Sequence, residues 1–190
     1  MRRAACFFLV SLMLFLPSCS SGGDSDGLYE KAKENASSAV SFDITADVKA
    51  DYGSQVYDFS FHFTGNENEG IIEVQAPKSV AGVSVEVKDG KVTAGKGGVN
   101  VYMGDIETIG ISPACALPEI MGAIKNGYVT ESGYEEISGK EALYADIYMT
   151  DSSYARVWFD KEGLMPFYAE IISDGKAVIF CTIKEISYVQ

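Results

Sequence analysis

Histidine and tryptophan are nearly absent from the sequence, and this limits the chemistry that it can support. The chain has a single histidine, His62, and a single tryptophan. A histidine general base or a histidine-containing metal site would therefore depend on His62. The alternation of its segment places His62 on an outward strand face beside Asp58, without a pocket. The G-x-S-x-G, H-E-x-x-H, P-loop and G-x-G-x-x-G motifs are also missing. We therefore expect no catalytic residue, no metal site and no cofactor.

Basic residues are scarce relative to acidic ones. The chain has 15 Lys and Arg residues against 27 Asp and Glu residues, a net charge of −12. If Arg2 and Arg3 are removed with a leader, 13 basic residues remain against the same 27 acidic ones, which gives −14. Nucleic acid is excluded as a partner by this balance, because binding to its phosphates requires a basic surface.

No apolar run in the sequence is long enough for a membrane-spanning helix, which needs about 20 residues. The longest run, Ala4 to Leu16, follows Arg2 and Arg3 and is typical of a signal peptide. It ends in Leu16-Pro17-Ser18-Cys19, which resembles the lipobox of bacterial lipoproteins. The resemblance implies removal of residues 1–18, lipidation of Cys19 and an extracytoplasmic protein anchored to the cell membrane. The alternative is an ordinary secretory signal with an incidental cysteine.

The residues after Cys19 are polar and small up to position 27, which predicts a flexible tether between the lipid and a single domain at 28–190. In a cell with two membranes, Ser20 would permit sorting to the outer membrane.

Two cysteines remain in the predicted domain, Cys115 and Cys181, and they leave two interpretations open. A disulfide between them is permitted, because disulfides persist outside the cytoplasm. Both also lie in apolar surroundings, so they fit equally well as two small buried residues. We favour the second interpretation.

The hydrophobic periodicity predicts one helix followed by many antiparallel strands. Helical spacing covers 27–40, and a second helix, with proline in its first turn, covers 118–125. Alternation with period two, interrupted by turns such as Asp89-Gly90 and Asp174-Gly175, covers the rest. The predicted strands are 42–49, 56–63, 72–76, 83–87, 92–94, 99–103, 134–137, 142–149, 155–159, 167–172 and 177–188. This order predicts an α+β fold, in which helices cover one face of a large curved antiparallel sheet.

One predicted strand carries a stripe of aromatic side chains on a single face: Tyr57, Phe59, Phe61 and Phe63. In a closed sandwich these residues would form ordinary core. In an open half-barrel they would line a cavity for an apolar ligand, together with Trp158 and Phe167. The fold therefore decides between the two interpretations.

The late part of the sequence is similar to a known family. Val157-Trp158-Phe159-Asp160, then Leu164-Met165-Pro166 and Ala169-Glu170-Ile171, resemble the late strand, turn and strand of LolA/LolB-like and LppX-like lipoproteins. The resemblance implies an unclosed β-barrel, with the N-terminal helix and the helical insertion over its concave face. It also implies that this face holds lipid. Soluble carriers of this family use an arginine on an early strand to hold the lid closed. Here the only arginine after the leader is Arg156, so the lid lock is missing.

Two functions from different classes follow. The first is a non-enzymatic, membrane-anchored protein that binds a lipid or other apolar ligand in a half-barrel cavity, with a role in lipid or lipoprotein trafficking. The second is a structural or interaction lipoprotein of the cell envelope, in which side chains fill the interior and the partner is another envelope protein.

The lipidation site is directly testable. We expect Cys19→Ala to abolish incorporation of radiolabelled palmitate and to leave an unprocessed precursor, because no other thiol lies at a signal-peptidase junction. Cys181→Ala is the matched control and should keep both labelling and processing. Palmitate incorporation into Cys19→Ala would refute the prediction.

Overall fold

The computed structural model describes residues 23–190, so the predicted signal peptide and Cys19 lie outside the described residues. Helix α1 (Gly23–Ser38) comes first, and 11 strands follow, with two short helices between the sixth and seventh. The strands of the first half are β1 (Ser41–Asp51), β2 (Val56–Gly65), β3 (Gly70–Ala76), β4 (Ser84–Lys88), β5 (Lys91–Lys96) and β6 (Val99–Asp105). The short helices are α2 (Ile106–Ile109) and α3 (Ala116–Asn126). The second half contains β7 (Val129–Ile137), β8 (Lys140–Thr150), β9 (Ser153–Phe159), β10 (Pro166–Ser173) and β11 (Lys176–Val189).

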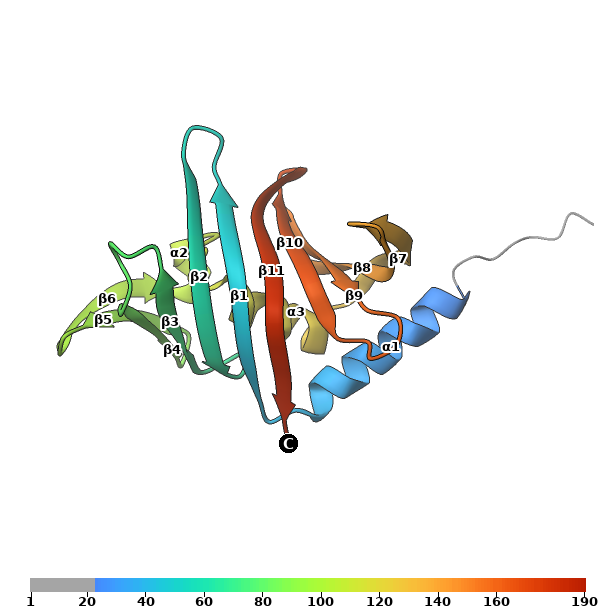
Figure 1. Cartoon of the computed structure of the whole chain (residues 1–190), viewed down its shortest axis with the longest axis horizontal. Helices are drawn as coiled ribbons and strands as arrows, with labels where there is room; N and C mark the ends of the chain where they lie inside the picture. Colours follow the sequence, from blue (N-terminus) through green and yellow to red (C-terminus); the bar gives the residue numbers. More distant parts are fainter. Residues whose placement is uncertain (1–22) are drawn as a thin grey trace, which may run out of the picture.

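All the strands belong to one antiparallel sheet that curves without closing (Figure 1). Its order is β6-β5-β4-β3-β2-β1-β11-β10-β9-β8-β7, so two meanders of hairpins meet where β1 pairs with β11. Two-residue turns join β4 to β5 and β10 to β11, where Asp89-Gly90 and Asp174-Gly175 have the positive φ angles that such hairpins require. The predicted α+β class, the large curved unclosed sheet and the covering helices are confirmed.

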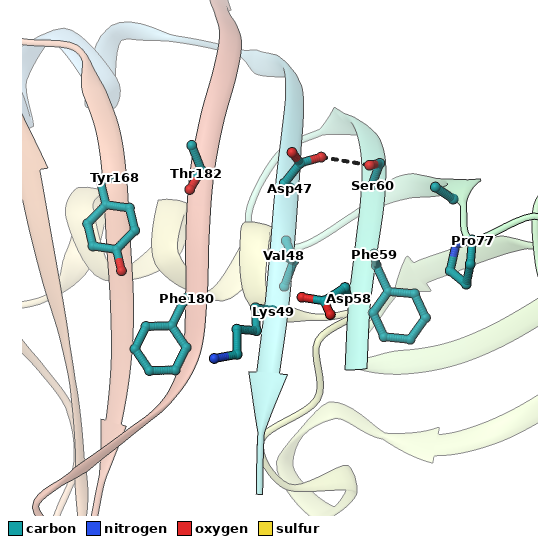
Figure 2. A pocket seen from close by; sticks show the side chains of 11 residues that line it. Asp47, Val48, Lys49, Asp58, Phe59, Ser60, Pro77, Tyr168, Phe180 and Thr182 are labelled. Carbon is teal, nitrogen blue, oxygen red and sulfur yellow. Dashed lines mark hydrogen bonds between the residues drawn. The ribbon is translucent and has the colours of Figure 1, made fainter. Parts of the chain in front are cut away.

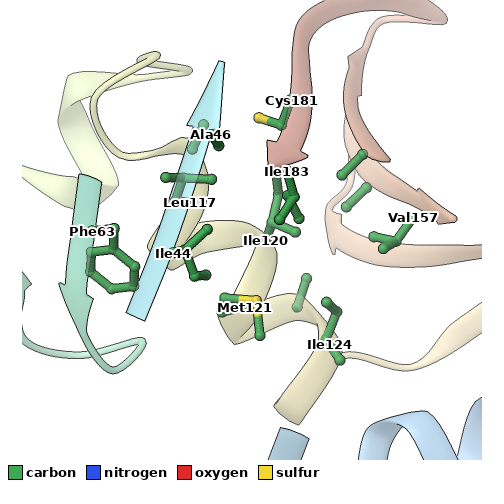
Figure 3. Packing of buried hydrophobic residues seen from close by; sticks show 14 of the residues in the cluster. Ile44, Ala46, Phe63, Leu117, Ile120, Met121, Ile124, Val157, Cys181 and Ile183 are labelled. Carbon is green, nitrogen blue, oxygen red and sulfur yellow. The ribbon is translucent and has the colours of Figure 1, made fainter. Parts of the chain in front are cut away.

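The core lies on the concave face, where helix α3 packs against the sheet (Figure 3). The alternation of β1 puts its apolar side chains on this face. Its alternate residues from Phe42 to Ala50 are buried, whereas Asp43 and Lys49 face outward and are exposed. Helix α3 is amphipathic and turns its apolar side to the same core. Its fully or almost fully buried side chains are Leu117, Ile120, Met121 and Ile124. Burial of each such side chain stabilises the fold by about 1.5–3 kcal/mol.

Helix α1 differs from its predicted bounds, since it begins at Gly23 instead of Gly27 and ends at Ser38 instead of Val40. The early start has a tertiary cause, because the Ser132 hydroxyl on β7 donates a hydrogen bond to the Asp26 carboxylate and is also hydrogen-bonded to the Ser25 hydroxyl. Ser25 is fully buried by this contact. A polar, glycine-containing segment is therefore fixed by polar partners, which hydrophobic periodicity cannot reveal. Within residues 23–190, no helix is long and apolar enough to cross a membrane.

The burial along β2 predicts unequal effects of two truncations. Phe61 is buried in the core, so Phe61→Ala should lower the free energy of unfolding by about 3–5 kcal/mol. Tyr57 lies on the same strand face but is exposed, so Tyr57→Ala should cost less than about 1 kcal/mol. Urea unfolding of both variants checks this, and similar losses in the two variants would contradict the burial described.

Candidate functional site

The aromatic stripe of β2 runs from the core to the surface along the concave face. Tyr57, Phe59, Phe61 and Phe63 alternate with outward residues, and the β1 residues opposite them are aliphatic. Phe63 and Phe61 are 0% and 2% exposed, Phe59 is half-buried, and Tyr57 is 42% exposed. The Phe59 ring is stacked on Phe61 at 5.2 Å and on Tyr57 at 6.4 Å. The stripe is thus a continuous apolar ladder that opens to solvent at one end.

The open end of the ladder lies beside the turn that joins β1 to β2, and we call this region the mouth. It is formed by Tyr52, Tyr57 and Phe59. Tyr52 packs edge-on against Tyr57 at 6.4 Å and donates a 2.9 Å hydrogen bond to the Ile111 carbonyl. The mouth is therefore tied to the segment that leads into α3. Burial, with the nearby Tyr57, raises the pKa of Tyr52, so its hydroxyl stays neutral and can donate this bond.

Strand β3 leaves the mouth uncovered on one side. Its last paired residue, Ala76, lies opposite Ser60, so β2 from Val56 to Phe59 extends beyond its neighbour. An apolar chain that entered at the mouth would meet ring faces. The carboxylate of Asp58 belongs to the other face of β2.

Helix α3 covers the deeper half of the stripe and is tied down at its C-terminal end by an ion pair. Lys125 lies 3.0 Å from Glu67 in the β2–β3 turn, and its ammonium group also lies over the Phe42 ring at 5.5 Å. Burial raises the pKa of Glu67, but a backbone hydrogen bond and Lys125 outweigh burial, so the pKa lies below its ordinary value. Both side chains are largely buried, which makes this pair stronger than an exposed one.

Sequence reasoning missed this ion pair. Glu67 lies in a polar segment that shows no hydrophobic pattern, and only the position of Lys125 in the last turn of a helix could have pointed to the pair. Arg156 does not hold the helix, because it lies on the convex face. There it donates two 2.6 Å hydrogen bonds to Asp146.

The structure does not place Trp158 and Phe167 with the stripe. Trp158 lies between the inward residues Val157 and Phe159, so the alternation of β9 turns it to the convex face. There its indole N–H donates to Glu135 at 3.1 Å, and its ring packs on Tyr168 at 5.2 Å. Phe167 lies at a break in the β9–β10 register, with the Lys140 ammonium 5.0 Å from its ring. The predicted set of six cavity residues is thus reduced to the four residues of β2.

The two cysteines are buried free thiols, Cys115 at the start of α3 and Cys181 in β11. The structure therefore favours the interpretation as two small buried residues over the disulfide. Burial raises the pKa of both thiols to about 12, helped at Cys115 by the carboxylate of Glu119. Thiols that stay protonated are poor nucleophiles and poor metal ligands.

The convex face carries a shallow groove of about 690 Å³ that crosses β10, β11, β1 and β2 (Figure 2). Its lining combines aromatic rings, including Phe59 at the edge of the stripe, with charged and hydroxyl groups. Lys49 lies over the Phe180 ring at 5.2 Å, and Asp47 accepts a 2.6 Å hydrogen bond from Ser60. Lys184 and Ser60 hold the pKa of Asp47 below its ordinary value. Asp47 is thus satisfied by Ser60 and Lys184, and Lys49 lies 3.5 Å from Asp51.

His62 is also on the convex face, where it lies 3.0 Å from Asp43 and 3.9 Å from Glu73. Its outward orientation agrees with the sequence prediction, but its neighbours are on β1 and β3, and Asp58 is not among them. Among residues 23–190, no three His, Cys, Asp or Glu side chains gather closely enough to hold a metal ion.

Comparison with known proteins gives similarity in structure but not in sequence. No protein-family model matches the chain, and no curated protein matches it. An uncharacterised conserved protein from Thermus thermophilus superposes with a TM-score of 0.51 at 9% identity, over 87% of this chain and 88% of that one. A LolA superfamily protein from Nitrosomonas europaea follows at 0.45 and 12% identity, over 87% and 93%. The Mycobacterium tuberculosis lipoprotein LppX gives 0.40 and 14% identity, over 84% and 94%.

The chain shares its fold, an unclosed antiparallel sheet with covering helices, with the uncharacterised Thermus thermophilus protein. At such low identities the likeness concerns the fold alone, and the chemistry of the site has to be argued from the residues of this chain.

Glu119, in the first turn of α3, is a second feature that sequence reasoning missed. Burial raises its pKa from 4.5 to about 7, so a charged carboxylate is disfavoured in the folded protein. Between these two pH values the folded chain binds more protons than the unfolded chain, so stability rises as the pH falls. The cost of the charged form is fully present above pH 7 and disappears below pH 4.5.

We therefore expect Glu119→Gln to raise the free energy of unfolding at pH 8 by about 1–3 kcal/mol, with little change at pH 4. Urea unfolding at the two pH values measures the difference. Glu136→Gln, at an exposed position on β7, is the control and should change the free energy of unfolding by the same small amount at both pH values. An equal effect of Glu119→Gln at pH 8 and pH 4 would contradict the role of burial.

Proposed function

We propose that this chain is a membrane-anchored lipoprotein that binds an acyl chain, a lipid or a similar apolar ligand and catalyses no reaction on it. The observation that carries the proposal is the exposed end of the aromatic ladder. Tyr57 and the half-buried Phe59 continue a buried stack into solvent, on the concave side of an unclosed sheet. Apolar surface that is continuous with the core and open to solvent is typical of a binding site for an apolar molecule.

The proposed ligand enters at the mouth and extends toward the core. In the structure the deeper half of the stripe is occupied by α3, whose side chains pack on the same face. A short acyl chain would fit at the mouth alone. A longer acyl chain would have to displace α3, and the ion pair between Lys125 and Glu67 resists this displacement. The helix would thus act as a cover whose position depends on the ligand.

The anchor belongs to the same proposal. Cys19 would carry the lipid and hold the domain at the membrane surface outside the cytoplasm. A protein held in this way meets lipid wherever it diffuses, which suits a role in lipid or lipoprotein trafficking. An envelope protein could then receive the ligand from the mouth, and nucleic acid is not a partner of so acidic a chain.

A second function is favoured by a different observation, namely the dense packing beneath α3. Side chains of α1, α3 and most strands form one buried cluster, and the deeper stripe residues Phe61 and Phe63 belong to it. If this packing persists in the cell, the chain is an interaction lipoprotein with a filled core, and its contacts are made by outer surfaces.

Uptake of a fluorescent fatty acid separates the two functions. We expect the wild-type protein to bind the probe. Phe59→Ala should weaken binding about tenfold, because loss of one aromatic contact costs about 1–2 kcal/mol. Phe167→Ala is the matched control, since it removes the same side chain at the β9–β10 register break, away from the mouth, and should leave binding unchanged. Native mass spectrometry of the protein from its own membrane would weigh a retained ligand directly.

Absence of probe binding by the wild type would reject the ligand-binding function and leave the interaction function. Equal losses in Phe59→Ala and Phe167→Ala would show that the mouth is not the site. Thermal unfolding of each variant, followed by circular dichroism, confirms that the compared proteins are folded.

A further inference from the structure

An unclosed sheet has two free edges, which here are β6 and β7. Along each edge one row of backbone N–H and C=O groups has no strand partner, and natural proteins protect such rows with charges, proline or a covering segment. Strand β7 is protected by charge, because Glu131, Glu135 and Glu136 lie along it. Strand β6 has no charged residue from Val99 to Gly104 and no proline. The two edges are therefore not equivalent.

Strand β6 is apolar and exposed on both of its faces. Val99 is 66% exposed, Val101 55%, Tyr102 57% and Met103 56%. Neither α1 nor α3 covers this end of the sheet, and α2 follows β6 directly. An uncharged edge with large exposed apolar side chains is the form that accepts a further strand by hydrogen bonding.

The charge around β6 differs from that of the rest of the chain. From Ser84 to Asp105 the three acidic residues Glu86, Asp89 and Asp105 are balanced by Lys88, Lys91 and Lys96, whereas the whole chain carries −12. Two copies of an acidic protein repel each other over most of their surfaces. This neutral end is where two copies can approach with little repulsion, whereas two β7 edges would bring glutamates together.

We propose that β6 is an interface between two copies of this chain, in which the two β6 strands pair antiparallel across a two-fold axis. Such an interface uses the same edge twice and closes after two copies, whereas pairing of β6 with β7 would continue without limit. The register that sets apolar residues opposite one another places Val101 against its own copy. It also brings Asp105 of one copy near Lys96 of the other. The two sheets then form one continuous sheet.

The strand has seven residues, so the contact is smaller than a standard interface of about 1,600 Å² and the dimer is weak. Disulfide crosslinking in cells that express the full chain captures such a contact. Val101→Cys should form a disulfide-linked dimer on mild oxidation, because residues directly opposite have Cβ atoms about 4.5–5.5 Å apart. Glu136→Cys, on the protected edge, is the matched control, and the wild type reports any background from the native thiols. The dimer band of Val101→Cys should be at least about five times as strong as the bands of Glu136→Cys and of the wild type. Only the thiol at position 101 lies opposite its own copy across the paired edge.

A second pair of variants tests the edge without relying on one cysteine position. Val99→Lys, added to Val101→Cys, places a charge on the edge and should remove most of the dimer band. Ile71→Lys, at an exposed apolar position on β3 away from the edges, should leave the band unchanged. Equal bands in Val101→Cys and Glu136→Cys, or no band above wild type, would overturn the proposal. Crosslinking of Val101→Cys to a different protein would also overturn it, since the occupant would then not be a second copy.

Discussion

The pairing of β1 with β11 is the contact on which the rest of the structure depends. Strands β2–β6 continue the sheet on one side of this pair and β10–β7 continue it on the other, so no other strand ladder joins the two halves within residues 23–190. The ladder runs from Ser41 opposite Val189 to Ala50 opposite Ile179, with one irregularity between Thr45 and Ala46. Because both strands bury alternate side chains beneath α3, their register fixes which face is concave and therefore where the aromatic stripe lies.

The concave face can either pack as core or leave apolar surface open for a ligand, and the residues of the stripe differ in which of the two they do. The side chains of Phe61 and Phe63 contribute to stability through burial in the core that α3 completes. Phe59 packs only partly against that core and Tyr57 is exposed, so these two residues leave apolar surface open. A protein that bound ligand deeper in the half-barrel would have to give up core contacts, so the buried ion pair between Lys125 and Glu67 sets part of the cost of opening. Stability and ligand capacity are thus opposed within one sheet face.

Much of the fold could be predicted from the sequence, because half-buried strands alternate and this sheet is made almost wholly of such strands. The alternation also located the β2 stripe and the outward side of His62. The predicted cavity set did not follow the alternation at Trp158, which lies on the convex face between the inward Val157 and Phe159. At Phe167 a register break interrupts the period. The alternation could not find the start of α1, which depends on Ser132, nor the contact of Lys125 with Glu67. Those features join residues far apart in the sequence through polar contacts, and periodicity reports only burial.

The hydrogen bond from the Val40 N–H to the Val189 carbonyl, 2.8 Å long, joins the start of β1 to the end of the chain. Its consequence concerns the order of events during synthesis. Strand β1 leaves the ribosome long before its partner β11, so the central ladder cannot form until the segments between them have been made. Contacts between such distant residues make folding slow, and an unpaired β1 edge is prone to aggregation in the meantime. One edge of β1 therefore stays unpaired for longer than the edges of a strand whose partners are both its neighbours in sequence.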